Sequence, residues 1–122
     1  MKTVSILGKE YPIEYTVEAQ SMIAERSGGL ENVAKTLTNH AAFFLYAMMV
    51  GAYNRQRVLA KYSGDEYEGP EPLQEGDISA ILFPKDMRTI IQTMTEVIKE
   101  ASITDVEVAE EKNPKKKEAK PD

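Results

Sequence analysis

Residues 2–15 constrain the fold most, because their alternating side chains sort into one apolar and one polar face of a β-hairpin. A type II′ turn at Gly8 and Lys9, with glycine supplying the positive φ of its first central position, pairs Leu7 with Glu10. The pairs that follow on the apolar face are Ile6 with Tyr11, Val4 with Ile13 and Lys2 with Tyr15. The side chains mostly on the polar face are Thr3, Ser5, Glu10, Pro12 and Glu14. A two-stranded ribbon alone is marginal in water, so the apolar face must be covered by the chain's own helices, by another protomer or by a partner.

Length and composition exclude several classes of function. The 122 residues leave room for one compact domain and a tail, and a net charge of -5 disfavours a nucleic-acid partner. The absence of cysteine excludes disulfides and thiolate chemistry and suits a reducing cytoplasm. The longest apolar run, residues 41–53, is shorter than the roughly 20 residues that span a bilayer, so no membrane partner is expected.

Helical spacing replaces alternation after the hairpin. Thr16 is the expected N-cap of a first helix, which ends at Gly28 and Gly29 because glycine readily adopts the left-handed conformation of a helix end. Apolar residues then recur at helical spacing, which predicts a second short helix over residues 30–38.

A third helix is predicted from about residue 40 to residue 62, with Asn39 as its cap. Its apolar residues recur at the 3.6-residue period of a helix face that packs on a core. The predicted core stripe consists of Phe44, Leu45, Met48, Ala52 and Leu59.

The same helix carries a second stripe on its opposite side, at spacings of three and four residues. This stripe consists of Phe43, Tyr46, Val50, Tyr53 and Arg57. One interpretation is structural, because a helix that is apolar all round is usually buried on all sides. The other is a partner-binding groove, because aromatic residues beside an arginine are enriched at the buried centres of interfaces.

The remaining chain is predicted to form a loop, two helices and a tail. Residues 63–75 are rich in Gly, Pro and acids and predict a solvated loop, and Asp77 is the expected cap of a short helical turn that Pro84 breaks. An amphipathic helix is predicted over residues 87–101, with Arg88, Gln92, Glu96 and Lys99 facing water. The overall prediction is an α+β fold, mostly α, with the hairpin packed on about four to five helices in one domain of residues 1–101. A disordered charged tail follows over residues 102–122.

No arrangement of residues indicates catalysis, a cofactor or a metal site. His40 is the only histidine and adjoins the predicted cap Asn39, so a structural role is expected for it. The acidic loop lacks the ligand spacing of an EF-hand, and no Gly-rich phosphate loop is present. We therefore expect a binding protein rather than an enzyme.

Two segments carry a resemblance to a known family, namely VSILGKEYPI at residues 4–13 and SGGLE at residues 27–31. Together they resemble the tail assembly chaperones of long-tailed bacteriophages and related prophages. Such proteins also contain an uninterrupted apolar helix, a loop with Pro and acids like residues 71–73, and a closing amphipathic helix followed by a polar tail. The resemblance covers residues 1 to about 101.

The resemblance implies a role without catalysis. Such chaperones bind the long helical tape measure protein in the host cytoplasm, help recruit tail tube subunits, and are absent from the mature virion. Many relatives have a longer form made by ribosomal frameshifting, and the lysine run at residues 115–117 fits an A-rich slippery stretch. We also expect self-association, to which the hairpin contributes.

Two other classes of function are considered. The main alternative is a structural head-tail connector or tail terminator that stays in the virion, with the hairpin completing a ring by strand addition. A small acidic mimic of nucleic acid, or a small acidic regulator, fits the net charge of -5 but does not explain the second apolar stripe.

Overall fold

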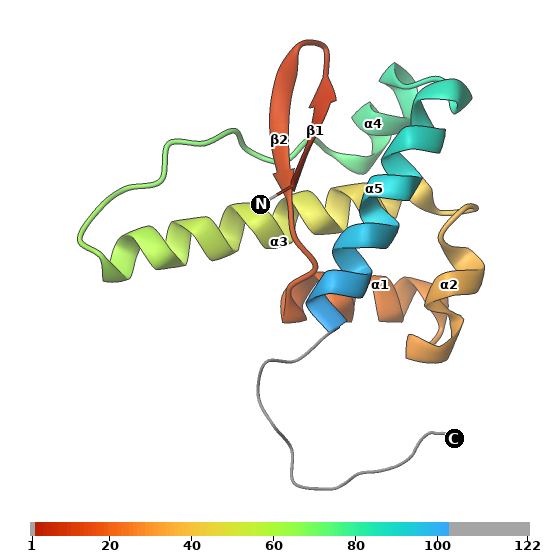
Figure 1. Cartoon of the computed structure of the whole chain (residues 1–122), viewed down its shortest axis with the longest axis horizontal. Coiled ribbons are helices and arrows are strands. Elements are labelled where there is room, and N and C mark those ends of the chain that lie inside the picture. The colour runs from red at the N-terminus through yellow and green to blue at the C-terminus, as the bar shows by residue number, and fades with distance from the viewer. Residues whose placement is uncertain (1, 103–122) are drawn as a thin grey trace, which may run out of the picture.

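An N-terminal β-hairpin lies across the longest helix of the molecule, and the other helices pack around this pair (Figure 1). The computed structural model describes residues 2–102. The fold is α+β and mostly α, as the sequence predicts. Its elements are β1 (Lys2–Ile6), β2 (Lys9–Ile13), α1 (Val17–Ser27), a 3-10 turn (Leu30–Asn32), α2 (Val33–Thr36), α3 (Ala41–Tyr62), α4 (Glu75–Ile81) and α5 (Pro84–Ser102).

The hairpin turn consists of Leu7 and Gly8, whose φ values are 53° and 78°. Positive φ at both central residues defines a type I′ turn, whose twist matches that of the flanking strands. The predicted turn at Gly8 and Lys9 is therefore wrong. Lys9 instead begins β2, and its ammonium group lies 5.8 Å from the centre of the Tyr11 ring.

The observed register differs from the predicted one by two residues. Val4 pairs with Tyr11, and Lys2 pairs with Ile13 instead of Tyr15. Side chains alternate with period two, so a shift of two residues leaves each on its predicted face. The four side chains that are buried on the apolar face are Val4, Ile6, Tyr11 and Ile13.

The limits of α1 are set by the residues that the sequence indicates. The Thr16 hydroxyl accepts a hydrogen bond of 3.1 Å from the backbone N–H of Ala19, and Gly28 ends the helix with φ 83°. The Gly29 N–H then donates to the carbonyl of Ala24 at 2.8 Å. Both predicted caps of this helix are confirmed.

Thr16→Ala is expected to lower the free energy of unfolding by about 1 kcal/mol, because the N–H of Ala19 loses its acceptor. Thr16→Ser keeps an oxygen in this position and serves as the control. Urea denaturation of the three proteins measures the difference. Equal midpoints for the wild type and Thr16→Ala would show that the cap contributes no stability.

The second short helix is shorter than predicted, because the 3-10 turn and α2 together end at Thr36. Asn39 is not the cap of α3, so that prediction is wrong. The N-cap is His40, with no side-chain cap hydrogen bond. Its N–H donates to the carbonyl of Thr36 at 2.9 Å, which closes the linking turn and places Asn39 one residue too early to cap the helix.

The two last helices begin earlier than predicted. Gln74 is the N-cap of α4, so the prediction of Asp77 as the cap is wrong. Asp77 lies in the first turn, where its negative charge interacts favourably with the helix dipole. Pro84 is the first residue of α5, a position that suits proline because no N–H is needed there. The predicted tail, apart from Ser102 at the end of α5, lies outside the described residues.

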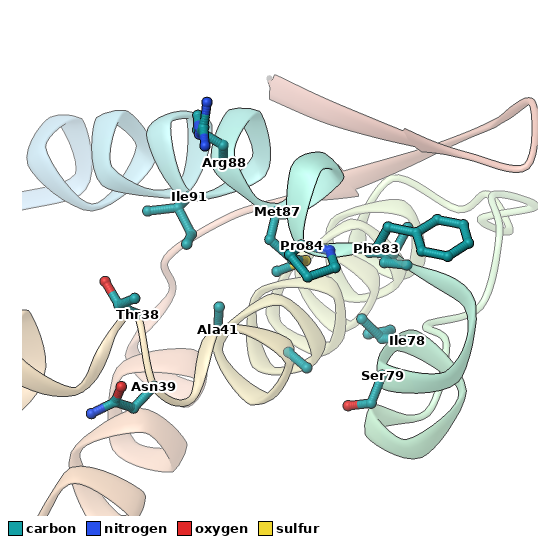
Figure 2. Close-up of a pocket in the computed structure, with 12 residues that line it drawn as sticks. Thr38, Asn39, Ala41, Ile78, Ser79, Phe83, Pro84, Met87, Arg88 and Ile91 are labelled. Carbon is teal, nitrogen blue, oxygen red and sulfur yellow. The ribbon is translucent and has the colours of Figure 1, made fainter.

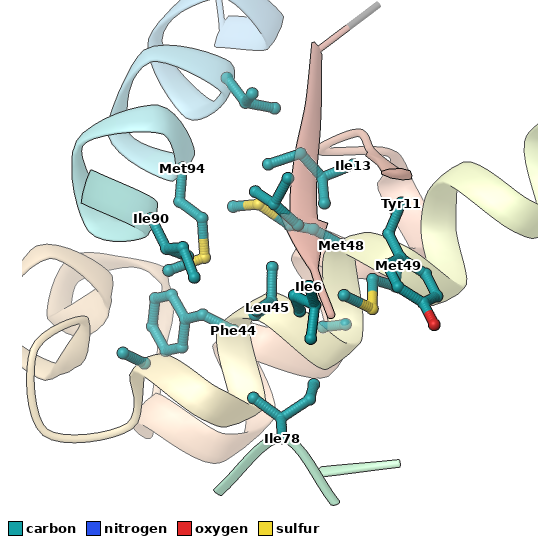
Figure 3. Packing of buried hydrophobic residues seen from close by; sticks show 14 of the residues in the cluster. Ile6, Tyr11, Ile13, Phe44, Leu45, Met48, Met49, Ile78, Ile90 and Met94 are labelled. Carbon is teal, nitrogen blue, oxygen red and sulfur yellow. The ribbon is translucent and has the colours of Figure 1, made fainter. Parts of the chain in front are cut away.

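The core forms where α3 and α5 cover the apolar face of the hairpin. Figure 3 shows Phe44 of α3 beside Ile90 of α5, with Ile6 and Ile13 of the hairpin in the same cluster. Of the alternatives left open for that face, the structure shows that the chain's own helices cover it. The predicted core stripe of α3 is buried except for Leu59, which lies beyond the point where neighbouring elements cover the helix.

Candidate partner-binding site

The second stripe of α3 lies against other parts of the same chain. Phe43, Tyr46, Val50 and Tyr53 are half-buried, and Arg57 is exposed. Phe43 and Tyr46 pack against the buried core, with their ring centres 6.1 Å apart. The five residues therefore share one side of the helix, as predicted, but they do not form one open surface.

Arg26 of α1 covers the first part of the stripe. Its guanidinium carbon lies 3.8 Å from the centre of the Phe43 ring, which is a cation–π contact. The same guanidinium group donates two hydrogen bonds of 3.3 Å to the carboxylate of Glu75 at the start of α4. These contacts tie α1, α3 and α4 together over Phe43.

The loop after α3 covers the later part of the stripe. Tyr67 of this loop packs edge-on against Tyr53, with ring centres 5.8 Å apart. The guanidinium group of Arg57 lies 5.7 Å from the same Tyr53 ring. These contacts favour the structural interpretation of the stripe, and its use as a partner groove stays a prediction.

An open groove lies between α5 on one side and the start of α3 and α4 on the other, and we call it the α4 groove. Its volume is about 630 Å³. Figure 2 shows Met87 and Ile91 pointing from α5 toward the side formed by Thr38 and Ala41. The lining residues are Thr38, Asn39, Ala41, Ala42, Ile78, Ser79, Leu82, Phe83, Pro84, Met87, Arg88 and Ile91.

Apolar side chains dominate the α4 groove. Ile78 is fully buried, and Leu82, Met87 and Ile91 are partly buried against the core. Phe83, between α4 and α5, keeps 64% of its surface exposed. An exposed aromatic ring beside an apolar groove is a feature of protein-binding surfaces.

Two cations and one carboxylate lie at or beside the α4 groove, although the chain as a whole carries -5. Among the described lining residues, Arg88 is the only charged one. The ammonium group of Lys85 lies 5.8 Å from the Phe83 ring. The carboxylate of Asp86 accepts a hydrogen bond of 2.9 Å from the backbone N–H of Phe83, which holds the start of α5. The groove therefore suits an apolar ligand that also carries carboxylates.

Sequence reasoning did not find the α4 groove, because its walls come from three segments that only the tertiary structure brings together. One local signal was present. Phe83 lies directly before Pro84, in the short link between α4 and α5, where neither helix buries its ring.

Within residues 2–102, no group of three or more His, Cys, Asp or Glu side chains could hold a metal ion. No described helix is long and apolar enough to cross a membrane. Comparison with protein-family models, curated proteins and solved structures finds no match for this chain.

Proposed function

We propose that this chain is a bacteriophage tail assembly chaperone that binds the tape measure protein and helps recruit tail tube subunits, without catalysis. It acts in the host cytoplasm and leaves before the virion matures. The observation that carries the proposal is the open, apolar α4 groove beside the exposed Phe83. The resemblance of residues 1 to about 101 to this family supplies the identity of the client.

The lining of the α4 groove supports binding of a helical segment. Amphipathic helices bind in apolar grooves between helices through residues one turn apart. Met87 has a flexible thioether side chain that adapts to different apolar partners, and Ile91 lies one turn further along α5. Arg88 is placed to pair with a carboxylate on the edge of the client helix.

Co-expression with the tape measure protein encoded downstream tests the proposal. We expect the wild-type chain to co-purify with this client. Phe83→Ala and Arg88→Glu are each expected to reduce the bound client about tenfold, because an aromatic or arginine anchor at an interface typically contributes more than about 1 kcal/mol. Leu30→Ala, an exposed residue outside the groove, is the control.

Failure of the wild type to co-purify with the tape measure protein would contradict the proposed function. Retention of the client by both groove variants would place the binding surface elsewhere. In that case Tyr46→Ala and Tyr53→Ala test the second stripe directly.

A structural connector or tail terminator is the second candidate, and one observation favours it. In the described sheet β1 pairs only with β2, and a groove of about 520 Å³ runs along β1 and the first half of α5. A strand edge of this kind accepts a strand from a neighbouring subunit. Mass spectrometry of purified particles separates the candidates, because a connector is present in defined copy number and a chaperone is absent.

A further inference from the structure

We infer that a second copy of this chain docks on the C-terminal part of α3, residues 53–62, which we call the α3 arm. The core side of α3 is buried from Ala41 to Ala52 and then continues beyond the elements that cover it. Figure 1 shows this end of α3 projecting past the other helices. Val58 and Leu59 are each 47% exposed, and Tyr62 is 84% exposed.

Exposed apolar side chains gather at the α3 arm. Among the described residues, four of the seven exposed large hydrophobic side chains lie there or beside it, namely Val17, Val58, Leu59 and Tyr62. Val17, at the start of α1, is 81% exposed and shares an apolar groove of about 560 Å³ with Val58 and Leu59. A gathered patch of this kind on a small protein marks an interaction site.

The charges around the α3 arm fit a second copy better than a partner of one charge sign. The arm carries Arg55, Arg57 and Lys61 and no acidic residue, and the guanidinium group of Arg55 forms an ion pair of 2.9 Å with Glu14 of the same chain. At its start, Glu18 accepts hydrogen bonds from Asn54. Past its end, the acids of residues 65–68 line a groove of about 610 Å³ next to Leu59. A strongly acidic or strongly basic partner would meet like charges at one end of this patch.

An antiparallel pair of arms related by a two-fold axis matches these charges. In such a pair, each end of one arm faces the opposite end of its partner, so Lys61 approaches the partner's Glu18. A two-fold interface must be complementary to itself, and this patch carries both signs with an apolar centre.

The shape of the molecule also favours the antiparallel arrangement. The hairpin and the other helices, which we call the body, cover the core side of α3 over residues 41–52. Two parallel arms in contact would bring these bodies into collision. Antiparallel arms place the bodies at opposite ends and bring Tyr62 toward the partner's Val17.

Sedimentation velocity of the full chain between about 1 and 100 μM tests the inference. We expect a dimer for the wild type. The double variant Leu59→Glu/Tyr62→Glu is expected to raise the dissociation constant at least about tenfold, because it places charges in the apolar centre. Leu30→Glu is the matched control, since Leu30 is 57% exposed on the 3-10 turn, and this variant is expected to dimerise like the wild type.

A charge exchange tests the orientation of the two copies. Lys61→Glu is expected to weaken the dimer, and adding Glu18→Lys is expected to restore it. Circular dichroism confirms that each variant keeps its helices. A wild type that is monomeric throughout the range, or arm variants that dimerise as well as the wild type, would overturn the inference. If Lys61→Glu weakens the dimer and the added Glu18→Lys does not restore it, the antiparallel arrangement is overturned.

This inference does not depend on the proposed client. Dimerisation is measured on the chain alone, so its failure leaves the tape measure experiment unaffected. The sequence predicts that the hairpin contributes to self-association, and the structure shows that the chain's own α3 and α5 cover its apolar face. The α3 arm is an exposed apolar surface separate from the α4 groove, and it is the surface that we assign to the second copy.

Discussion

Replacing Phe44 with alanine is expected to lower the free energy of unfolding by about 3–5 kcal/mol. The Phe44 side chain is fully buried, and it lies beside Ile90 at the contact between α3 and α5 (Figure 3). Truncation removes this apolar surface and leaves a cavity that rigid neighbours fill only in part. Because small domains are stable by only about 5–15 kcal/mol, this loss is a large fraction of the total.

Phe83→Ala is the matched control for Phe44→Ala. The same side chain is removed, but Phe83 is mostly exposed, so the free energy of unfolding is expected to change by less than about 0.5 kcal/mol. Chemical denaturation followed by circular dichroism measures both variants. Similar losses for the two would mean that Phe44 does not hold α5 against α3.

Gly51→Ala is the second change with a large expected effect, about 2 kcal/mol of lost stability. A Cβ at Gly51 would lie 2.5 Å from the Thr16 hydroxyl and 3.1 Å from the Ala19 Cβ, so α1 and α3 must move apart. That movement disturbs the Thr16 cap. The better helix propensity of alanine offsets only about 1 kcal/mol of the loss.

Gly76→Ala is the control for Gly51→Ala. Gly76 lies in the first turn of α4, and a Cβ there meets nothing within 4 Å. Alanine at this position is expected to stabilise the protein slightly, because it reduces the freedom of the unfolded chain. Thermal melting of both variants gives the comparison. If Gly51→Ala melts at or above the wild-type temperature, the close approach of α1 to α3 does not constrain residue 51.

Local features of the fold were predictable because they depend on neighbouring residues. The threonine hydroxyl before α1 and the glycines after it fix that helix whatever packs on it. The faces of the hairpin were also predictable. Apolar side chains that alternate with period two remain on one face when the register shifts by two residues. The turn was mispredicted because Leu7 takes a left-handed conformation, which nothing in an apolar side chain signals.

Features that depend on tertiary contacts could not be read from spacing. Leu59 has the same helical period as Phe44, yet Leu59 is half-exposed, because no element covers that end of α3. The stripe through Tyr53 was identified correctly as one side of α3. Its contact with Tyr67 depends on how the long loop returns, which helical periodicity does not encode.

β1 and α5 pack against each other, although they lie at opposite ends of the described chain. The ammonium group of Lys2 lies 3.6 Å from the carboxylate of Glu96 and 3.9 Å from that of Glu100, and Val4 shares the core with Met94. Of the two helices that cover the apolar face of the hairpin, α3 is translated before the loop and α4, and α5 is translated after them. The part of the apolar face that α5 covers therefore stays open until α5 has been translated, so native packing is completed only when nearly the whole described chain has been made.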